Sequence, residues 1–111
     1  MQDLFKTQLT SRRQRLVELL QRVNYGSVEN LKIAGGDPSF EPKPTILRDF
    51  KFGPTNENGA RPELAKANFR LKAALLQMFE LFDQLGDGVI ELLEVKAGLP
   101  FRIVIREQSA V

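Results

Sequence analysis

Histidine and cysteine are both absent from this chain of 111 residues. Without them the chain cannot form a Ser/His/Asp or Cys/His catalytic system, a zinc site of the usual ligands, or a disulfide. Asp, Glu, Lys and Tyr remain for acid–base work, but histidine is the side chain whose ordinary pKa lies near neutral pH. We therefore expect a protein that is not an enzyme, with no cofactor and no metal ligand.

Long apolar runs are also missing from the sequence. No segment approaches the roughly 20 apolar residues that cross a bilayer, and the N-terminus MQDLFKTQLTSRRQR lacks the apolar core of a signal peptide. The sequence therefore predicts a cytoplasmic protein that does not contact a membrane. With 42% hydrophobic and 27% charged residues, residues 1–111 are expected to form a single domain with one modest core.

Positive charge is concentrated near the N-terminus, although the net charge is only +2. Arginines in the first predicted helix could contact phosphates, because that contact is electrostatic and independent of sequence. These arginines are Arg12, Arg13, Arg15 and Arg22. A solvated helix face is the more ordinary interpretation, since nucleic-acid sites usually have a larger basic stripe or interleaved aromatics. Nucleic-acid binding is therefore an alternative hypothesis for function.

Apolar periodicity predicts two helices, each followed by two strands. The predicted helices are residues 11–24 and 63–85, and the predicted strands are residues 28–33, 45–52, 89–95 and 100–107. The first helix starts either at Ser11, which would form a capping box with Gln14, or at Asp3. With the later start, residues 1–10 are expected to be disordered.

The two outer strand candidates differ in the pattern of their faces. The strand at 45–52 places Ile46, Phe50 and Phe52 on one side. The last strand alternates apolar residues with arginines, except that Val104 makes its outer face partly apolar. Residues 34–38, with sequence AGGDP, and the pair Ala97-Gly98 are predicted to be turns.

The chain matches itself when it is shifted by 62 residues, which aligns residues 16–38 with 78–100. Seven of the 23 aligned positions are identical, and they include a glycine after each helix and a glycine in each hairpin turn. A repeated backbone path explains why this permissive residue recurs at both points. The sequence therefore predicts an α+β fold of two helix–strand–strand units (αββαββ), with a small antiparallel sheet and both helices on one face.

The first unit, LVELLQRVNYGSVENLKIAGGDP, combines a helix, an aromatic-Gly-Ser step, an alternating strand and a glycine turn. In this pattern it resembles the small bacterial YezD-like proteins, which have no settled activity. The resemblance implies a fold element and supplies no site residues. This chain departs from those single-unit proteins because it carries the unit twice and inserts a proline-rich stretch.

Residues 83–94 match part of the calcium-binding loop of an EF-hand. Acids occupy its first, fifth and twelfth positions, which are Asp83, Asp87 and Glu94, and Gly88 occupies the sixth. However, the third position needs an oxygen ligand and is Leu85, and the residues that follow are predicted to form a strand in place of the second helix. Calcium binding through a degenerate EF-hand-like loop is therefore a further alternative.

The second predicted helix has a wider apolar arc than the roughly 100° that packing on one sheet face requires. Phe69, Leu76 and Phe79 widen its apolar stripe. Either the first helix covers this surface inside the monomer, or a partner covers it. Our leading hypothesis is a non-enzymatic interaction module that binds a protein partner or self-associates as a homo-oligomer through these residues.

Overall fold

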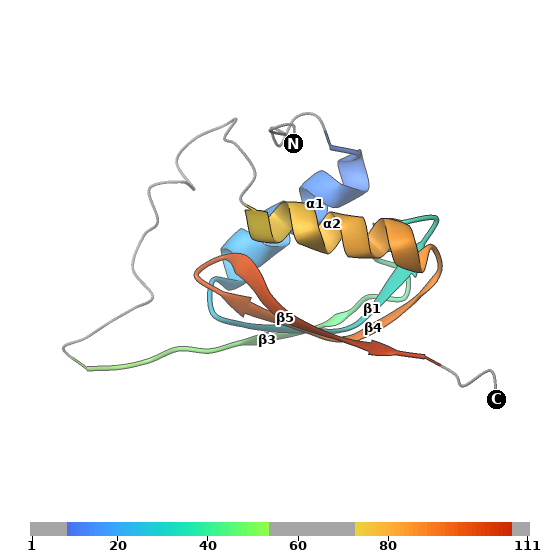
Figure 1. The fold of residues 1–111 in the computed structure, drawn as a ribbon. Helices are drawn as coiled ribbons and strands as arrows, with labels where there is room; N and C mark the ends of the chain where they lie inside the picture. The colour runs from blue at the N-terminus through green and yellow to red at the C-terminus, as the bar shows by residue number, and fades with distance from the viewer. Residues whose placement is uncertain (1–8, 54–72, 108–111) are drawn as a thin grey trace.

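The computed structural model describes residues 9–53 and 73–107. Within these ranges there are two helices, α1 (Ser11–Val23) and α2 (Ala73–Leu85), and five strands. The strands are β1 (Gly26–Ala34), β2 (Asp37–Ser39), β3 (Thr45–Arg48), β4 (Gly88–Lys96) and β5 (Leu99–Arg106). All of the strand pairs are antiparallel and belong to one sheet (Figure 1). The predicted α+β class with an antiparallel sheet is therefore confirmed.

The sheet has the strand order β2–β1–β4–β5, and β3 pairs with β1 outside this path. Both β2 and β3 use the same edge of β1, since β3 pairs with residues 26–29 and β2 with residues 32–34. The opposite edge of β1 pairs with β4 along most of its length. β5 pairs with β4 and forms the far edge of the described sheet.

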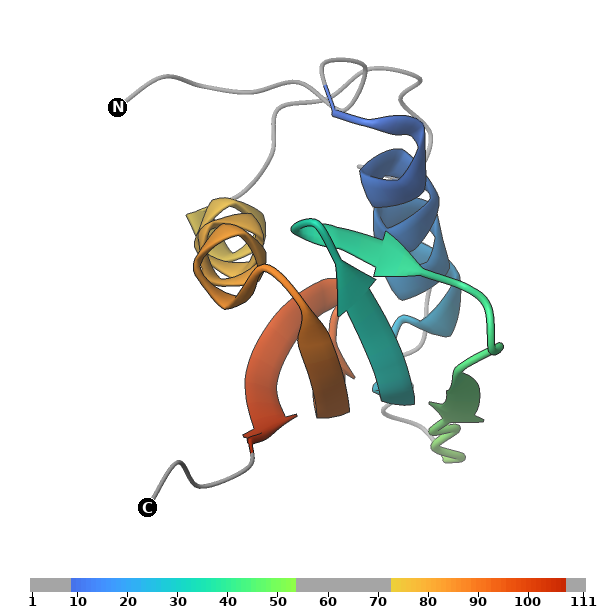
Figure 2. The ribbon, with the colours of Figure 1, turned by 90° about the vertical axis from the view of Figure 1, so that its right-hand side faces the viewer.

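Both helices lie on the same face of the sheet, and the core lies between the two layers (Figures 1 and 2). The core side chains are apolar, at most 4% exposed, and contributed by both helices and both central strands. They are Leu16, Val17, Leu20, Val23, Val28, Leu31, Ile33, Leu75, Met78, Phe79, Phe82, Ile90, Leu93 and Val95. The two helices and the two central strands therefore share one core.

Helix α1 begins at Ser11, which agrees with the later of the two predicted starts. The N-cap is Thr10 and not Ser11, since the Thr10 hydroxyl accepts a hydrogen bond from the Arg13 backbone N–H at 3.2 Å. Gln14 does not close a capping box. Its side-chain amide donates to the Leu9 carbonyl at 2.8 Å instead. The cap therefore lies one residue earlier than the sequence predicts.

Strand β3 is shorter than the predicted strand at 45–52, because its partner strand β1 does not extend beyond Gly26. β1 begins at Gly26, which pairs with Arg48, and the residues before it end helix α1. A last hydrogen bond joins the Asp49 N–H to the Tyr25 carbonyl at 2.7 Å. Residues beyond this point have no strand beside them to extend the ladder.

Two phenylalanines that the sequence assigns to this strand therefore lie outside it. Phe50 is 56% exposed and Phe52 is 94% exposed. The turn predicted at residues 34–38 also proves shorter, since strand β2 begins at Asp37. The first half consequently has three strands where two were predicted, and the element order is αβββαββ.

Helix α2 is described from Ala73 and ends at Leu85, the predicted end. Residues 63–72 of the predicted helix lie outside the described residues. Neither α1 nor the described α2 is long and apolar enough to cross a membrane.

Candidate functional site

Two of the three residues predicted to bind a partner, Leu76 and Phe79, are described by the structure, and both pack against the core. Phe79 is 3% exposed, and its ring makes an edge-on contact with Phe82 at 5.8 Å between centroids. Leu76 is half-buried and packs against the core, and Phe69 lies outside the described residues. The guanidinium of Arg13 on α1 lies 4.9 Å from the Phe79 ring centroid. Phe79 is therefore covered inside the monomer, and its ring is not available to a partner.

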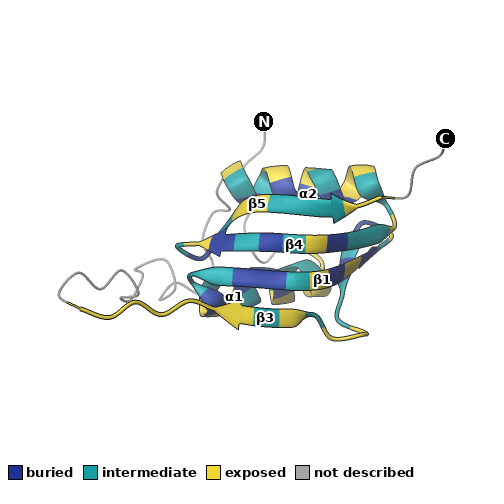
Figure 3. Ribbon diagram, turned by 90° about the horizontal axis from the view of Figure 1, so that it is seen from below, coloured by how far each residue is buried: buried dark blue, intermediate teal, exposed yellow. Residues whose placement is uncertain are grey.

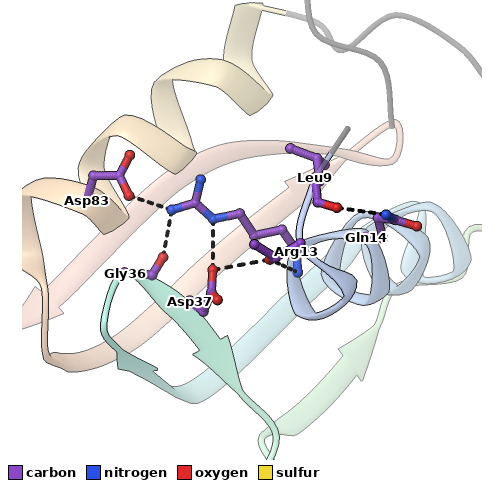
Figure 4. A network of polar contacts seen from close by, with 7 residues as sticks. Leu9, Arg13, Gln14, Gly36, Asp37 and Asp83 are labelled. Carbon is purple, nitrogen blue, oxygen red and sulfur yellow. Dashed lines mark hydrogen bonds and ion pairs between the residues drawn. The ribbon is translucent and has the colours of Figure 1, made fainter. Parts of the chain in front are cut away.

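Arg13 also connects three segments of the chain (Figure 4). Its Nη2 donates to the Gly36 carbonyl at 2.8 Å and to the Asp83 carboxylate at 2.6 Å, and its Nε lies 3.1 Å from the Asp37 carboxylate. The Arg13 side chain is only 15% exposed. These contacts offset the unfavourable interaction of the Arg13 charge with the helix dipole in the first turn of α1. They also remove Arg13 from the residues that could contact a phosphate.

The acids of the EF-hand-like segment are engaged by groups of the chain itself. Asp83 pairs with Arg13, and the Asp87 carboxylate accepts a hydrogen bond from the Gly35 N–H at 2.9 Å. Glu94 lies on strand β4 and pairs across the sheet with the Nε of β5 residue Arg102 at 3.1 Å. In the described part of the chain, no group of three or more His, Cys, Asp or Glu residues could hold a metal ion.

A groove of about 340 Å³ lies between α1 and the segment that joins β2 to β3. Two of the predicted phosphate-binding residues, Arg15 and Arg22, line it, whereas Arg12 does not. The other lining residues are Glu18, Leu19, Phe40, Lys43, Pro44 and Ile46. The groove thus combines basic and apolar side chains, and we call it the α1 groove.

The second face of the sheet carries no described helix, and we call it the open sheet face (Figure 3). Strand register places four apolar side chains on it, because their chain neighbours point into the core. These residues are Leu47, Val89, Leu92 and Val104, from three strands of the sheet. Leu47 is 48% exposed, and the other three are half-buried.

An aromatic groove of about 310 Å³ occupies one end of the open sheet face. Tyr25, Leu92 and Phe101 supply its apolar lining, and Phe101 is 63% exposed. Lysine ammonium groups lie over both rings, since Lys51 Nζ is 6.0 Å from the Tyr25 centroid and Lys96 Nζ is 4.8 Å from the Phe101 centroid. Such contacts are favourable but weak at exposed positions. Phe101 is therefore exposed beside its lysine, whereas Tyr25 is half-buried.

The amino-acid sequence alone did not predict the open sheet face. One signal pointed to it, namely the apolar Val104 on the outer side of the last strand. The other members, such as Leu92 opposite Glu29, become neighbours only through strand pairing. No protein-family model, curated protein or solved structure matches the chain. Function is accordingly inferred from the geometry of these surfaces.

Proposed function

We propose that the protein is a non-enzymatic interaction module that self-associates through the open sheet face. The observation that carries this proposal is the set of apolar side chains left on the face opposite the helices, Leu47, Val89, Leu92 and Val104. Removing such surface from water is the main favourable contribution to protein association. Clustered apolar side chains on a surface are typical of interaction sites.

The charges of the open sheet face favour a second copy of the chain as the partner. Strand register and ion pairs place carboxylates and cations on this face together. They are Glu29, Glu91 and Glu94, and Lys32, Lys96, Arg102 and Arg106. In a twofold dimer the same patch meets itself, so it must offer both signs of charge to be complementary. A partner of one charge sign would meet repulsion on part of this face.

Sedimentation velocity at several micromolar concentrations tests this proposal. We expect the wild-type chain to gain the mass of a dimer as concentration rises, whereas Leu92→Lys stays monomeric because it buries a charge in the interface. Gln84→Lys is the matched control, since it adds the same charge on the helical side, where Gln84 is exposed. A wild-type chain that remains monomeric throughout the range contradicts self-association.

We further infer that residues 16–38 and 78–100 are an internal repeat. Each half then buries the apolar face of the other. Reciprocal hydrogen bonds support this inference. The Gly36 N–H donates to the Gly86 carbonyl, and the Gly98 N–H donates to the Asn24 carbonyl, both at 2.8 Å. Residues Gly98 and Gly86 follow Gly36 and Asn24 by the same 62 positions that align the sequence with itself.

The ladder between the two central strands supports the repeat independently. Gly26 of β1 pairs with Val95 of β4. The residues aligned with these two by the 62-residue shift, Gly88 and Ile33, also pair with each other. Backbone torsions agree as well, because φ is 64° at Asn24 and 70° at its equivalent, Gly86. A local twofold axis through the β1–β4 pair accounts for all of these relations.

Nucleic-acid binding and calcium binding gain no comparable support. For nucleic-acid binding, one of the four predicted arginines, Arg13, is already engaged in contacts inside the monomer. For the second, Asp83, Asp87 and Glu94 each have a partner within the chain, and Glu94 lies along a strand away from the turn. We therefore propose neither as a second function.

A further inference from the structure

The α1 groove is formed by one stripe of helix α1 and by the chain that passes beside it. Arg15, Leu19 and Arg22 are spaced four and three residues apart, which places them on one side of the helix. The opposite wall comes from the segment between β2 and β3 and from Ile46 of β3 itself. The volume of the α1 groove, about 340 Å³, falls within the range of small-molecule sites.

The floor of the α1 groove is apolar and anchored. Leu19, Phe40 and Ile46 are half-buried, and all three pack against the buried core. Pro44 adds a further apolar surface with a restricted backbone. A floor supported in this way keeps its shape when a ligand enters, so little ordering is required on binding.

The rim of the α1 groove is basic. Arg15, Arg22 and Lys43 contribute three positive charges and Glu18 one negative charge, which leaves a net charge of +2 around the opening. The Arg15 guanidinium lies over the Phe40 ring at 4.5 Å from the centroid, so a cation stands directly at the edge of the apolar floor. The groove therefore presents adjacent regions for an apolar group and an anionic group.

We propose that the α1 groove binds a small amphipathic anion, which has an apolar chain or ring joined to a carboxylate or sulfonate. The apolar body lies on Leu19, Phe40 and Ile46, and the acid group meets the cations of the rim. Neither a neutral apolar molecule nor a simple inorganic anion uses both regions, and each binds more weakly for that reason. The groove lies on the helical side of the sheet, so its occupation is independent of self-association through the open sheet face.

The first test measures fluorescence of 8-anilinonaphthalene-1-sulfonate, an aromatic sulfonate, with the full chain. We expect saturable enhancement that decanoate reverses, while decanol and inorganic phosphate at equal concentration reverse much less. The double variant Arg15→Gln/Arg22→Gln should bind the dye at least about tenfold more weakly, equivalent to about 1.4 kcal/mol. Arg12→Gln, on the same helix but outside the groove, should change affinity less than about twofold.

The second test locates the decanoate by amide chemical shifts in ¹H–¹⁵N spectra of the folded chain. Shifts concentrated at residues 15–22 and 40–46 support the proposal. Shifts concentrated at Tyr25, Leu92 and Phe101 would instead assign the ligand to the aromatic groove and overturn it. Equal dye affinity of the double variant and the wild-type chain, or equal displacement by decanol and decanoate, also overturns it.

Discussion

The two halves of the molecule make the same helix end and the same hairpin turn, yet they continue differently after the turn. In the second half, β5 has eight residues, and seven of them pair with β4. In the first half, β2 has three residues, and the chain then leaves β1 and returns as β3. Residues 39–44 contain Pro42 and Pro44, which have no N–H to donate to a ladder. A shared turn therefore does not guarantee a shared sheet edge.

The helices of the two halves also differ in charge. α1 carries four arginines, whereas the described α2 carries only two charged residues, Glu80 and Asp83. One of these two residues, Asp83, forms an ion pair with Arg13 of α1. The two helices therefore carry charges of opposite sign where they meet at this ion pair.

The largest expected effect concerns the shared core. Leu20→Ala and Phe82→Ala remove fully buried side chains at equivalent positions of the two halves. Each variant should lower the free energy of unfolding by about 3–5 kcal/mol, because each leaves a cavity. Urea denaturation followed by circular dichroism checks this and should show one transition. If either variant unfolds in two separate steps, the halves do not share a single cooperative core.

The next effect compares the glycines that follow the two helices. A Cβ on Gly26 would lie 2.0 Å from the Leu47 carbonyl oxygen, which is backbone of β3. For a Cβ on Gly88 the three nearest atoms all belong to the Leu85 side chain, at 3.0–3.2 Å, and this side chain can adjust. We expect Gly26→Ala to cost about 2–3 kcal/mol and Gly88→Ala less than about 1 kcal/mol. Thermal unfolding of both variants measures the difference, and equal costs would argue against the close approach of β3.

A smaller effect tests the contact between the halves at Arg13. Arg13→Gln should reduce stability by about 1–2 kcal/mol, because it loses charged hydrogen bonds to Asp83 and Gly36. The exposed ion-pair partner Asp83 limits the loss. Arg12→Gln is the matched control and should stay within about 0.5 kcal/mol, since Arg12 is exposed. Denaturant midpoints that coincide for the two variants would rule out a stabilising role for this network.

The smallest expected effect comes from substituting the first residue of each hairpin turn with the residue found in the other turn. Ala97 has φ of 56° and its equivalent Gly35 has φ of 60°, a region that strains residues other than glycine. We expect Ala97→Gly to stabilise the protein by about 0.5–1 kcal/mol and Gly35→Ala to destabilise it by about 1 kcal/mol. Because a Cβ on Gly35 meets nothing within 4 Å, only the backbone contributes. Thermal unfolding of both variants decides the signs, and shifts in the same direction would contradict this account.

The amino-acid sequence by itself determined the α+β class, the end of each helix and the two central strands, with small errors at their boundaries. Apolar periodicity and turn glycines act over a few residues, so a single chain read in order is sufficient to find them. The sequence also marked glycines that adopt positive φ in both hairpin turns, such as Gly36 and Gly98.

Only the tertiary structure decided which surfaces remain available. It buried Phe79 beneath Arg13, engaged Arg13 with an aspartate 70 positions away, and ended β3 where its partner strand begins. It also left the open sheet face without any helix from the described residues (Figure 3), and it formed the α1 groove between α1 and the segment before β3. These outcomes depend on contacts between remote residues, and local propensity does not specify which remote residues meet.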